Sequence, residues 1–305
     1  MTEKETGFQA RLRSREQVLV VEVTPPKGGD PDPLRSAAKR YQGKVHAISV
    51  SDNRHGICMA SLAAGAVLAS EGMEPIVHVV TRDRNRIALI ADCLGAQALG
   101  VRNILCTSGT HQTLPGCSQA RNVFDMDSTQ LIEAITHLGN DGSMFFGERF
   151  EPAGPFCLGA VAAPFADPAE LQLIRLAKKV NAGAEFLITQ PVYDLDRFRT
   201  WWGQVTKRSI HEKSAVLASI QPLLDAGSAK AYAESRPTPR VPRSLLDRLS
   251  SAGNAEAERA VGIDIAVETI KQVSGLKGLA GFQICADGDE GAVLEILERS
   301  GLEVR

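Results

Sequence analysis

The stretch Ala182-Gly-Ala-Glu-Phe-Leu-Ile-Thr-Gln190 carries the clearest fold signal in this chain of 305 residues. A small turn at Gly183 precedes a short apolar run, Glu185 to Ile188, and this pattern predicts a buried strand. Two polar residues, Thr189 and Gln190, follow at the carboxyl end of the run. Parallel α/β folds hold ligands at that end of their strands, so Gln190 is a candidate site residue. The alternative is a glutamine that only caps a loop.

Seven further apolar runs lie along the chain, and helical patterns separate them. Eight short strands that are apolar on both faces favour a closed (β/α)8 TIM barrel, an α/β fold. We expect one domain over residues 1–305, with residues 1–16 as an N-terminal extension. An open doubly wound sheet is the alternative, although it more often has a Gly-rich turn where this chain has Thr24-Pro25-Pro26. The expected strands are 17–23, 45–51, 75–80, 101–107, 157–162, 185–188, 215–220 and 279–285, and the expected helices include 57–70, 85–94, 127–138, 168–182, 195–205, 226–234, 243–250, 255–273 and 290–300.

Composition and charge exclude several classes of protein. The 34 basic and 36 acidic residues give a formal charge of −2, so we expect neither nucleic acid nor an acidic membrane as a partner. No apolar run reaches the roughly 18 residues that a membrane span needs. The first 17 residues are charged and lack the apolar core of a secretory signal, so we expect a cytoplasmic protein.

The cysteines and histidines give no metal-binding pattern. Six cysteines are scattered without a Cys-x-x-Cys pair, which is typical of reduced cytoplasmic thiols. An iron–sulfur cluster held by this chain alone is not expected. His46, His55, His78 and His111 have no ligand spacing, and neither His-Glu-x-x-His nor a Gly-x-Ser-x-Gly elbow occurs. We therefore expect no metal site and no serine-type hydrolase.

Two ionisable residues interrupt apolar strands. Glu22 lies within the run 18–23. It is either a desolvated acid at a polar barrel mouth, suited to proton transfer, or a structural glutamate paired with an arginine or lysine. His78, within 75–80, is either a satisfied core group or a residue that contacts a ligand. The hydroxyl-rich loop 107–111 could offer backbone N–H groups to a phosphate or a flavin, although the same residues form ordinary turns.

Taken in order, these motifs resemble the methylenetetrahydrofolate reductase family over about residues 17–303. Within that family, the chain looks closer to the short enzymes of anaerobic and one-carbon-using bacteria. Such proteins are flavin-dependent (β/α)8 barrels. The motifs are Glu22-Val-Thr-Pro-Pro26, Ile48-Ser-Val-Ser51, His78, Thr81-Arg-Asp-Arg-Asn85, Asn103-Ile-Leu-Cys-Thr-Ser-Gly109, Val123-Phe-Asp-Met-Asp-Ser128, Pro164-Phe-Ala-Asp-Pro168, Ala182 to Gln190 and Leu217-Ala-Ser-Ile-Gln-Pro222.

The resemblance implies reduction of 5,10-methylenetetrahydrofolate to 5-methyltetrahydrofolate, or the reverse oxidation, with FAD as the hydride carrier. Glu22 is then the acid that protonates a folate nitrogen, Gln190 binds the pterin, and Tyr232 stacks on the folate. The residues that are expected to line the FAD are Ser51, His78, Ser108, Gly109, Thr110, Phe124 and Lys179.

One departure from the family pattern opens alternatives. The family usually has an aspartate after the glycine of the fourth-strand loop, and here Thr110 occupies that place. The uncharged residue favours a flavin-free, folate-binding methyl or one-carbon transferase or demethylase subunit on the same barrel. A third interpretation is a non-catalytic subunit of an electron-transfer complex. Reductases of this subtype often have a small cysteine-rich electron-transfer partner. A homo-oligomer is also compatible, and the sequence leaves the electron donor open.

Overall fold

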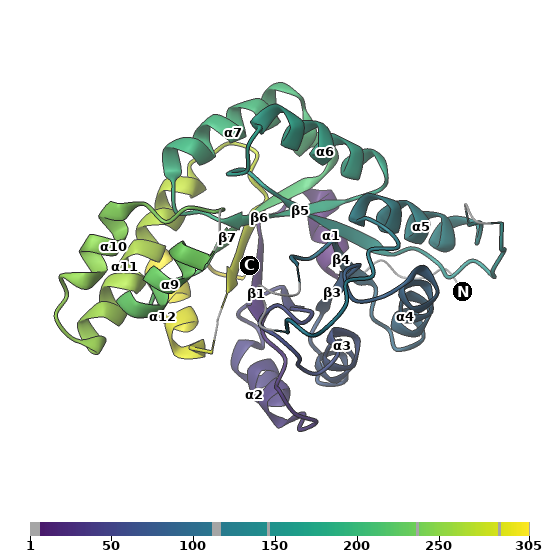
Figure 1. Ribbon diagram of the computed structural model, residues 1–305, viewed down its shortest axis with the longest axis horizontal. Helices are drawn as coiled ribbons and strands as arrows, with labels where there is room; N and C mark the ends of the chain where they lie inside the picture. The colour runs from purple at the N-terminus through teal and green to yellow at the C-terminus, as the bar shows by residue number, and fades with distance from the viewer. Residues whose placement is uncertain (1–6, 112–116, 145–146, 236–237, 286–287, 305) are drawn as a thin grey trace.

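The computed structural model describes residues 7–111, 117–144, 147–235, 238–285 and 288–304. Eight parallel strands close into a barrel in sequence order, β1-β2-β3-β4-β5-β6-β7-β8, and β8 pairs with β1. The helices lie around the outside of the strands (Figure 1). The predicted (β/α)8 barrel is therefore confirmed, and the open sheet is excluded because an open sheet leaves its first and last strands unpaired.

The strands are short, as the apolar runs predict, and β1, β2, β3 and β8 are completely buried. They are β1 Val18–Val23, β2 Ala47–Val50, β3 Pro75–Val80, β4 Asn103–Thr107, β5 Cys157–Ala162, β6 Phe186–Pro191, β7 Ala215–Ile220 and β8 Gly281–Cys285. The helices are α1 Gly7–Ser14, α2 Asp32–Tyr41, α3 Ser61–Ser70, α4 Arg86–Ala98, α5 Ser128–Asn140, α6 Ala169–Asn181, α7 Leu195–Lys207, α8 Ile210–Lys213, α9 Ala226–Ser235, α10 Arg243–Ser250, α11 Ala255–Ser274 and α12 Glu290–Ser300.

The barrel interior is filled from the amino ends of the strands. One cluster of buried apolar side chains includes Val18 and Val20 of β1, Phe186 of β6 and Phe8 of α1. The Phe8 ring meets the Phe186 ring edge-on, with 5.3 Å between the ring centroids. Helix α1 therefore closes the amino end of the barrel. It lies within the segment expected as an N-terminal extension, and the assignment of residues 1–305 to one domain stays a prediction.

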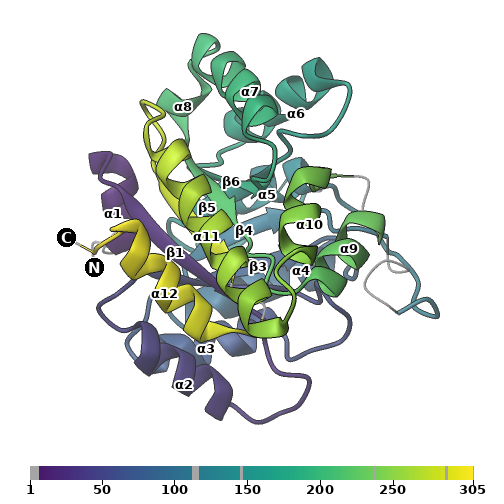
Figure 2. The same cartoon turned by 90° about the vertical axis from the view of Figure 1, so that its left-hand side faces the viewer.

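A second, larger cluster lies between the strands and the outer helices, and it includes Phe198 and Trp201 of α7. A third and smaller cluster joins α9, α10 and α11 through Ala229, Leu249 and Ile265. These three helices lie together beside the barrel in both views (Figures 1 and 2). The chain between β7 and β8 therefore contributes three helices to the outer layer.

Three boundaries differ from the sequence prediction by three residues or more. Helix α4 runs on to Ala98, past the expected end at residue 94. Strand β6 runs on to Pro191, past the expected end at Ile188, with a register shift between Ile188 and Pro191. Helix α3 begins at Ser61 and not at residue 57, because the Asn53 side chain accepts a hydrogen bond from the Cys58 backbone N–H and holds a loop there. The apolar pattern could not reveal the end of β6 or the start of α3, since these depend on hydrogen bonds of polar side chains, Thr189 with Ser219 and Asn53 with Cys58.

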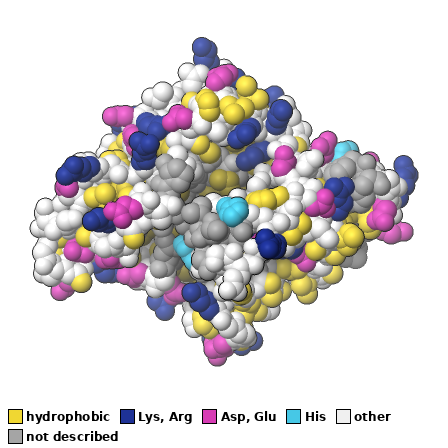
Figure 3. Space-filling model, viewed as in Figure 1, with side chains coloured by type: hydrophobic (Ala, Val, Ile, Leu, Met, Phe, Trp, Pro, Cys, Tyr) yellow, Lys and Arg dark blue, Asp and Glu magenta, His cyan; other side chains and the backbone are white. Residues whose placement is uncertain are grey.

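Neither sign of charge dominates the face of the molecule that Figure 3 presents. Figure 3 shows Lys and Arg interspersed with Asp and Glu on the face that it presents. No helix among the described residues is long and apolar enough to cross a membrane.

Candidate functional site

The inward-facing side chains of the strands become polar toward their carboxyl ends. Side chains two residues apart share one face of a strand, so the inward series of β1 runs through Val18 and Val20 to Glu22. At this end the barrel encloses a cavity of about 280 Å³. Its lining includes Glu22, His78, Thr107, Gln190, Ser219 and Gln283, contributed by six different strands or their ends. We take this cavity, the barrel-mouth cavity, as the candidate active site.

Glu22 is 5% exposed and lies among polar side chains at the barrel mouth. Arg54, from the loop between β2 and α3, donates from Nη1 to Glu22 Oε1 over 2.5 Å. The Gln283 side-chain amide donates to Glu22 Oε2 over 2.7 Å, and Cys285 Sγ lies 3.9 Å from the same oxygen. Glu22 faces the polar barrel mouth and also has an arginine partner, so the two sequence interpretations are compatible with each other.

Gln190 reaches the same cavity from β6. Its Nε2 donates to the Thr238 hydroxyl over 3.2 Å, whereas its buried Oε1 has no hydrogen-bond partner among the described residues. Thr189 Oγ1 accepts from the backbone N–H of Ser219, close to the register shift in β6. The amide oxygen of Gln190 is therefore left as an acceptor for a ligand. The loop-capping alternative explains the hydrogen bond of the amide nitrogen to Thr238 but not the buried oxygen.

His78, Gly109 and Thr110 line the same cavity. The His78 Nε2 lies 2.6 Å from Ser49 Oγ, so the ring is satisfied as a core group and also faces the site. Burial lowers the pKa of His78 below its ordinary 6.5, Arg54 lowers it further and Glu22 raises it. Burial therefore favours the neutral imidazole, and the charged partner of Glu22 is Arg54.

The loop after β4 brings its backbone to the cavity at a glycine. Gly109 has a φ of +77°, and a Cβ there would lie only 2.7 Å from Val80 Cγ1. Thr110 follows, and its carbonyl accepts from Arg82 Nη1 over 3.1 Å. Because no side chain is present at Gly109, a flat ligand can approach the peptide groups of this loop.

Four of the residues expected to line FAD do not line the barrel-mouth cavity. Ser51 is buried with a hydroxyl that has no partner among the described residues, and Ser108 Oγ accepts from the N–H of Ser128. Lys179 donates from Nζ to the Val161 carbonyl over 2.8 Å, and burial lowers its pKa. Phe124 is 43% exposed, with a positive φ of 44°.

Tyr232 lines a separate cavity of about 580 Å³. Its ring meets Tyr193 edge-on, with 6.0 Å between centroids. Gln221 also lines this second cavity, and its Oε1 accepts from Arg54 Nη2 over 2.9 Å. Arg54 lines the barrel-mouth cavity, so the Arg54–Gln221 hydrogen bond lies where the two cavities meet. The structure thus does not bring Tyr232 into contact with Glu22 or Gln190, but it places the tyrosine in the next compartment.

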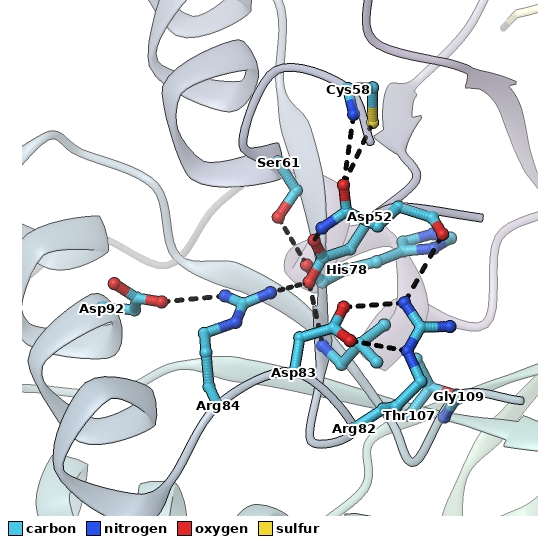
Figure 4. Close-up of polar contacts among 12 residues, drawn as sticks. Asp52, Cys58, Ser61, His78, Arg82, Asp83, Arg84, Asp92, Thr107 and Gly109 are labelled. Atoms are coloured by element: carbon cyan, nitrogen blue, oxygen red, sulfur yellow. Dashed lines mark hydrogen bonds and ion pairs between the residues drawn. The ribbon is translucent and has the colours of Figure 1, made fainter. Parts of the chain in front are cut away.

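A charged network borders the site on the β3 side (Figure 4). Arg84 pairs with both Asp52 and Asp92, and Arg82 forms a two-bond contact with Asp83. Burial raises the pKa of Asp52, and Arg84 opposes that shift. A cavity of about 490 Å³ shares Asp52 and Arg82 with the barrel-mouth cavity, so a ligand with two parts has two neighbouring compartments here.

Sequence reasoning did not single out Arg54, Gln221 or Gln283. Gln283 had a usable signal, because it is a polar residue inside an apolar strand, as Glu22 is. Gln221 lies within the motif 217–222, although that motif assigns it no role, and nothing in the local pattern of Arg54 distinguishes it from other loop residues.

Within the described ranges, no group of three His, Cys, Asp or Glu side chains is placed to hold a metal ion. A larger cavity of about 1080 Å³ lies at the opposite end of the barrel, beside segments that lead into β6, β7 and β8. None of the expected site residues lines that cavity.

Two solved structures share the fold. A protein described as an uncharacterized protein from Clostridium thermocellum that binds two copies of 5-methyl-5,6,7,8-tetrahydrofolic acid has a TM-score of 0.64 and 11% identity, and the match covers 96% of this chain and 97% of that one. DmoA from Hyphomicrobium sulfonivorans has a TM-score of 0.57 and 9% identity, with 93% and 86% coverage.

Curated sequences extend the comparison. A Caenorhabditis elegans protein named "Probable methylenetetrahydrofolate reductase (NADPH)" is 22% identical over 95% of this chain and 43% of its own length. Methylenetetrahydrofolate reductase 2 of Schizosaccharomyces pombe is 31% identical over 48% of this chain and 25% of its own. The chain thus spans less than half the length of these relatives. The sequence model of methylenetetrahydrofolate reductase matches residues 7–301, nearly the whole chain, and the chain therefore belongs to the methylenetetrahydrofolate reductase family.

Proposed function

We propose that this chain catalyses the flavin-dependent reduction of 5,10-methylenetetrahydrofolate to 5-methyltetrahydrofolate, or the reverse oxidation. The observation that carries the proposal is the pair Glu22 and Gln190, which face one cavity at the carboxyl ends of the strands. One is a buried carboxylate, the side chain that moves a proton, and the other is an amide with an acceptor oxygen to spare.

The loop at Gly109 supports FAD as the cofactor. Its positive φ and its close packing on Val80 leave peptide groups at the cavity wall, where an isoalloxazine ring can approach them. His78, Gly109 and Thr110 would hold the ring, and the neighbouring cavity beside Arg82 would take the rest of the dinucleotide. Four further FAD contacts stay proposals, because they require the side chains or the ligand to move. They are Ser51, Ser108, Phe124 and Lys179. Bound reduced flavin would supply the hydride that turns the methylene carbon into a methyl group.

The chain's own residues would do the remaining work. Glu22, when protonated, gives its proton to N10 of the folate and opens the five-membered ring. Gln190 uses both ends of its amide to hold the pterin, with Oε1 as acceptor and Nε2 as donor once it leaves Thr238. Tyr232, in the next cavity, would stack on the part of the folate beyond the pterin. These contacts would place two flat rings together and exclude water between them.

A direct test begins with the purified protein. We expect a yellow protein that releases about one FAD per chain on denaturation. Its flavin, reduced anaerobically with dithionite, should be re-oxidised by 5,10-methylenetetrahydrofolate. Glu22→Gln should slow that re-oxidation about 10²- to 10⁴-fold while FAD binding and thermal stability stay close to wild type. Glu133→Gln, an exposed change on α5, is the matched control. Unchanged turnover in Glu22→Gln would contradict the catalytic role.

Thr110 favours a second candidate function. Its side chain carries no charge, and its carbonyl is engaged with Arg82. A flavin-free subunit that binds methyltetrahydrofolate and transfers or removes its methyl group needs no carboxylate at this place. A colourless protein that takes up no added FAD but binds tetrahydrofolates would support this alternative over the first. A cytoplasmic location, a small cysteine-rich electron-transfer subunit and a homo-oligomer also stay proposals.

A further inference from the structure

Arg54 connects the proposed acid to the boundary between two cavities. It extends from the loop between β2 and α3, with its side chain 21% exposed, and meets a Glu22 side chain that is 6% exposed. One guanidinium nitrogen donates to Glu22 Oε1 over 2.5 Å, and the other donates to Gln221 Oε1 over 2.9 Å. Arg54 thus bridges β1 and the end of β7 across the barrel mouth.

The surroundings of Glu22 favour its ionised form. Both carboxylate oxygens accept hydrogen bonds, one from Arg54 and one from Gln283. Donors of this kind stabilise a carboxylate more than a carboxylic acid, and the charged one contributes most. Burial acts in the opposite direction, so the outcome depends on Arg54. The ionisable groups that face Glu22 include Arg54, His78 and Cys285, from the β2–α3 loop, β3 and β8.

We infer that Arg54 is a positioning residue that holds Glu22 ionised in the folate-free site and thereby sets the pH window of the reaction. The inference rests on the proposed function. It concerns a residue that does not itself react, and it predicts that reduction of the folate requires Glu22 to take up a proton first. The reverse oxidation can use the ionised Glu22 directly, as the base that accepts a proton.

The proton balance makes the consequence definite. The oxidation removes a hydride from the N5-methyl group, which bound oxidised flavin would accept. N10 would form a bond to the resulting methylene carbon, and the N10 proton would pass to the Glu22 carboxylate. In the reduction, the same proton must be on Glu22 at the start, and it returns to N10 as the N10–carbon bond breaks. A substitution at Arg54 leaves the equilibrium between the free folates unchanged. It therefore shifts the pH profile of the oxidation and the pH profile of the reduction alike.

The test compares Arg54→Met, which removes the charge at similar length, with Arg54→Lys, which keeps it. The rate constant for re-oxidation of dithionite-reduced flavin by 5,10-methylenetetrahydrofolate is measured between pH 5 and 9. We expect the wild-type rate to fall with rising pH over this whole range, because the wild-type midpoint lies below pH 5, and we expect Arg54→Met to move the midpoint up by about one pH unit or more, so that its rate levels off at the acidic end of the range. Arg54→Lys keeps the positive charge, so its midpoint should stay close to the wild-type value. Arg248→Met, which removes an exposed partner of Glu268, is the control.

One outcome would overturn the inference. If wild type and Arg54→Met have the same pH profile for flavin re-oxidation and the variant only has a higher KM for folate, Arg54 binds substrate and does not set the protonation of Glu22.

A measurement without turnover separates this inference from the proposed function. Carbon-13 NMR of protein labelled at glutamate carboxyl groups follows Glu22 directly, with Glu22→Gln to assign its signal. We expect the wild-type signal to titrate at lower pH than an ordinary exposed glutamate. A signal that titrates at higher pH refutes the inference even if Arg54→Met does not fold. If Glu22 titrates low but no folate reacts, the proposed function fails and the role of Arg54 in holding the charge stands.

Discussion

At the scale of single residues, Gln190 has a hydrogen-bond acceptor that a ligand can use. Its Oε1 is buried and has no partner in the described ranges, a condition that costs free energy unless a ligand completes it. Gln190→Ala should therefore weaken the binding of 5-methyltetrahydrofolate about tenfold, the loss of roughly one to two kcal/mol of hydrogen bonding. Isothermal titration calorimetry checks this.

Gln204→Ala, an exposed change on α7, provides the comparison for Gln190. It should bind the folate as wild type does. Equal affinities for wild type and Gln190→Ala would show that the pterin lies elsewhere in the barrel.

At the scale of elements, two glycines on either side of β4 form a matched pair, Gly100 before the strand and Gly109 in the loop after it. Gly109 and Gly100 have nearly equal positive φ values of +77° and +76°, but an added Cβ would meet Val80 at 2.7 Å only at Gly109, whereas nothing lies within 4 Å at Gly100. Both alanine variants should lose about 1 kcal/mol or more of stability from the left-handed backbone. Only Gly109→Ala should also lower FAD affinity, because only there must the loop move.

Fluorescence titration of the apoprotein with FAD, together with urea unfolding, separates the two effects at these glycines. A loss of FAD affinity in Gly100→Ala as large as in Gly109→Ala would mean that general destabilisation is responsible, and the β4 loop would lose its proposed role.

At the scale of the whole molecule, His78 couples stability to pH. Burial lowers the pKa of its imidazole below 6.5 in the folded protein, so the unfolded chain takes up a proton at a higher pH than the folded one. The stability that this difference provides is present above about pH 6.5 and is lost as the pH falls toward the lower folded value.

His78→Gln should therefore reduce the loss of unfolding free energy between pH 7.5 and 5.5. Urea unfolding at the two pH values measures that loss, and His55→Gln, on an exposed loop, should leave it unchanged. The histidine would have no such role if His78→Gln and wild type lost the same free energy over this interval.

The fold could be predicted because its determinants are local. Apolar runs such as 18–23 and 75–80, with helical patterns between them, are enough to indicate eight βα units, and all eight strands form where they were expected. The missed pieces depend on contacts between distant segments. Helix α1 is stabilised by Phe8 against Phe186, and the end of β6 depends on the bond between Thr189 and Ser219. No local pattern contains such pairs.

The sequence by itself determined that Glu22, His78 and Gln190 would lie at one end of a barrel, since each follows or interrupts an apolar strand and all strand ends of that kind meet. Only the tertiary structure decided that Arg54 and Gln283 hold the Glu22 carboxylate, and that Tyr232 lies in a separate cavity. The reason is physical. Alternation along a strand places a side chain on a face, whereas its charged partner arrives from a loop whose path depends on the packing of the whole barrel.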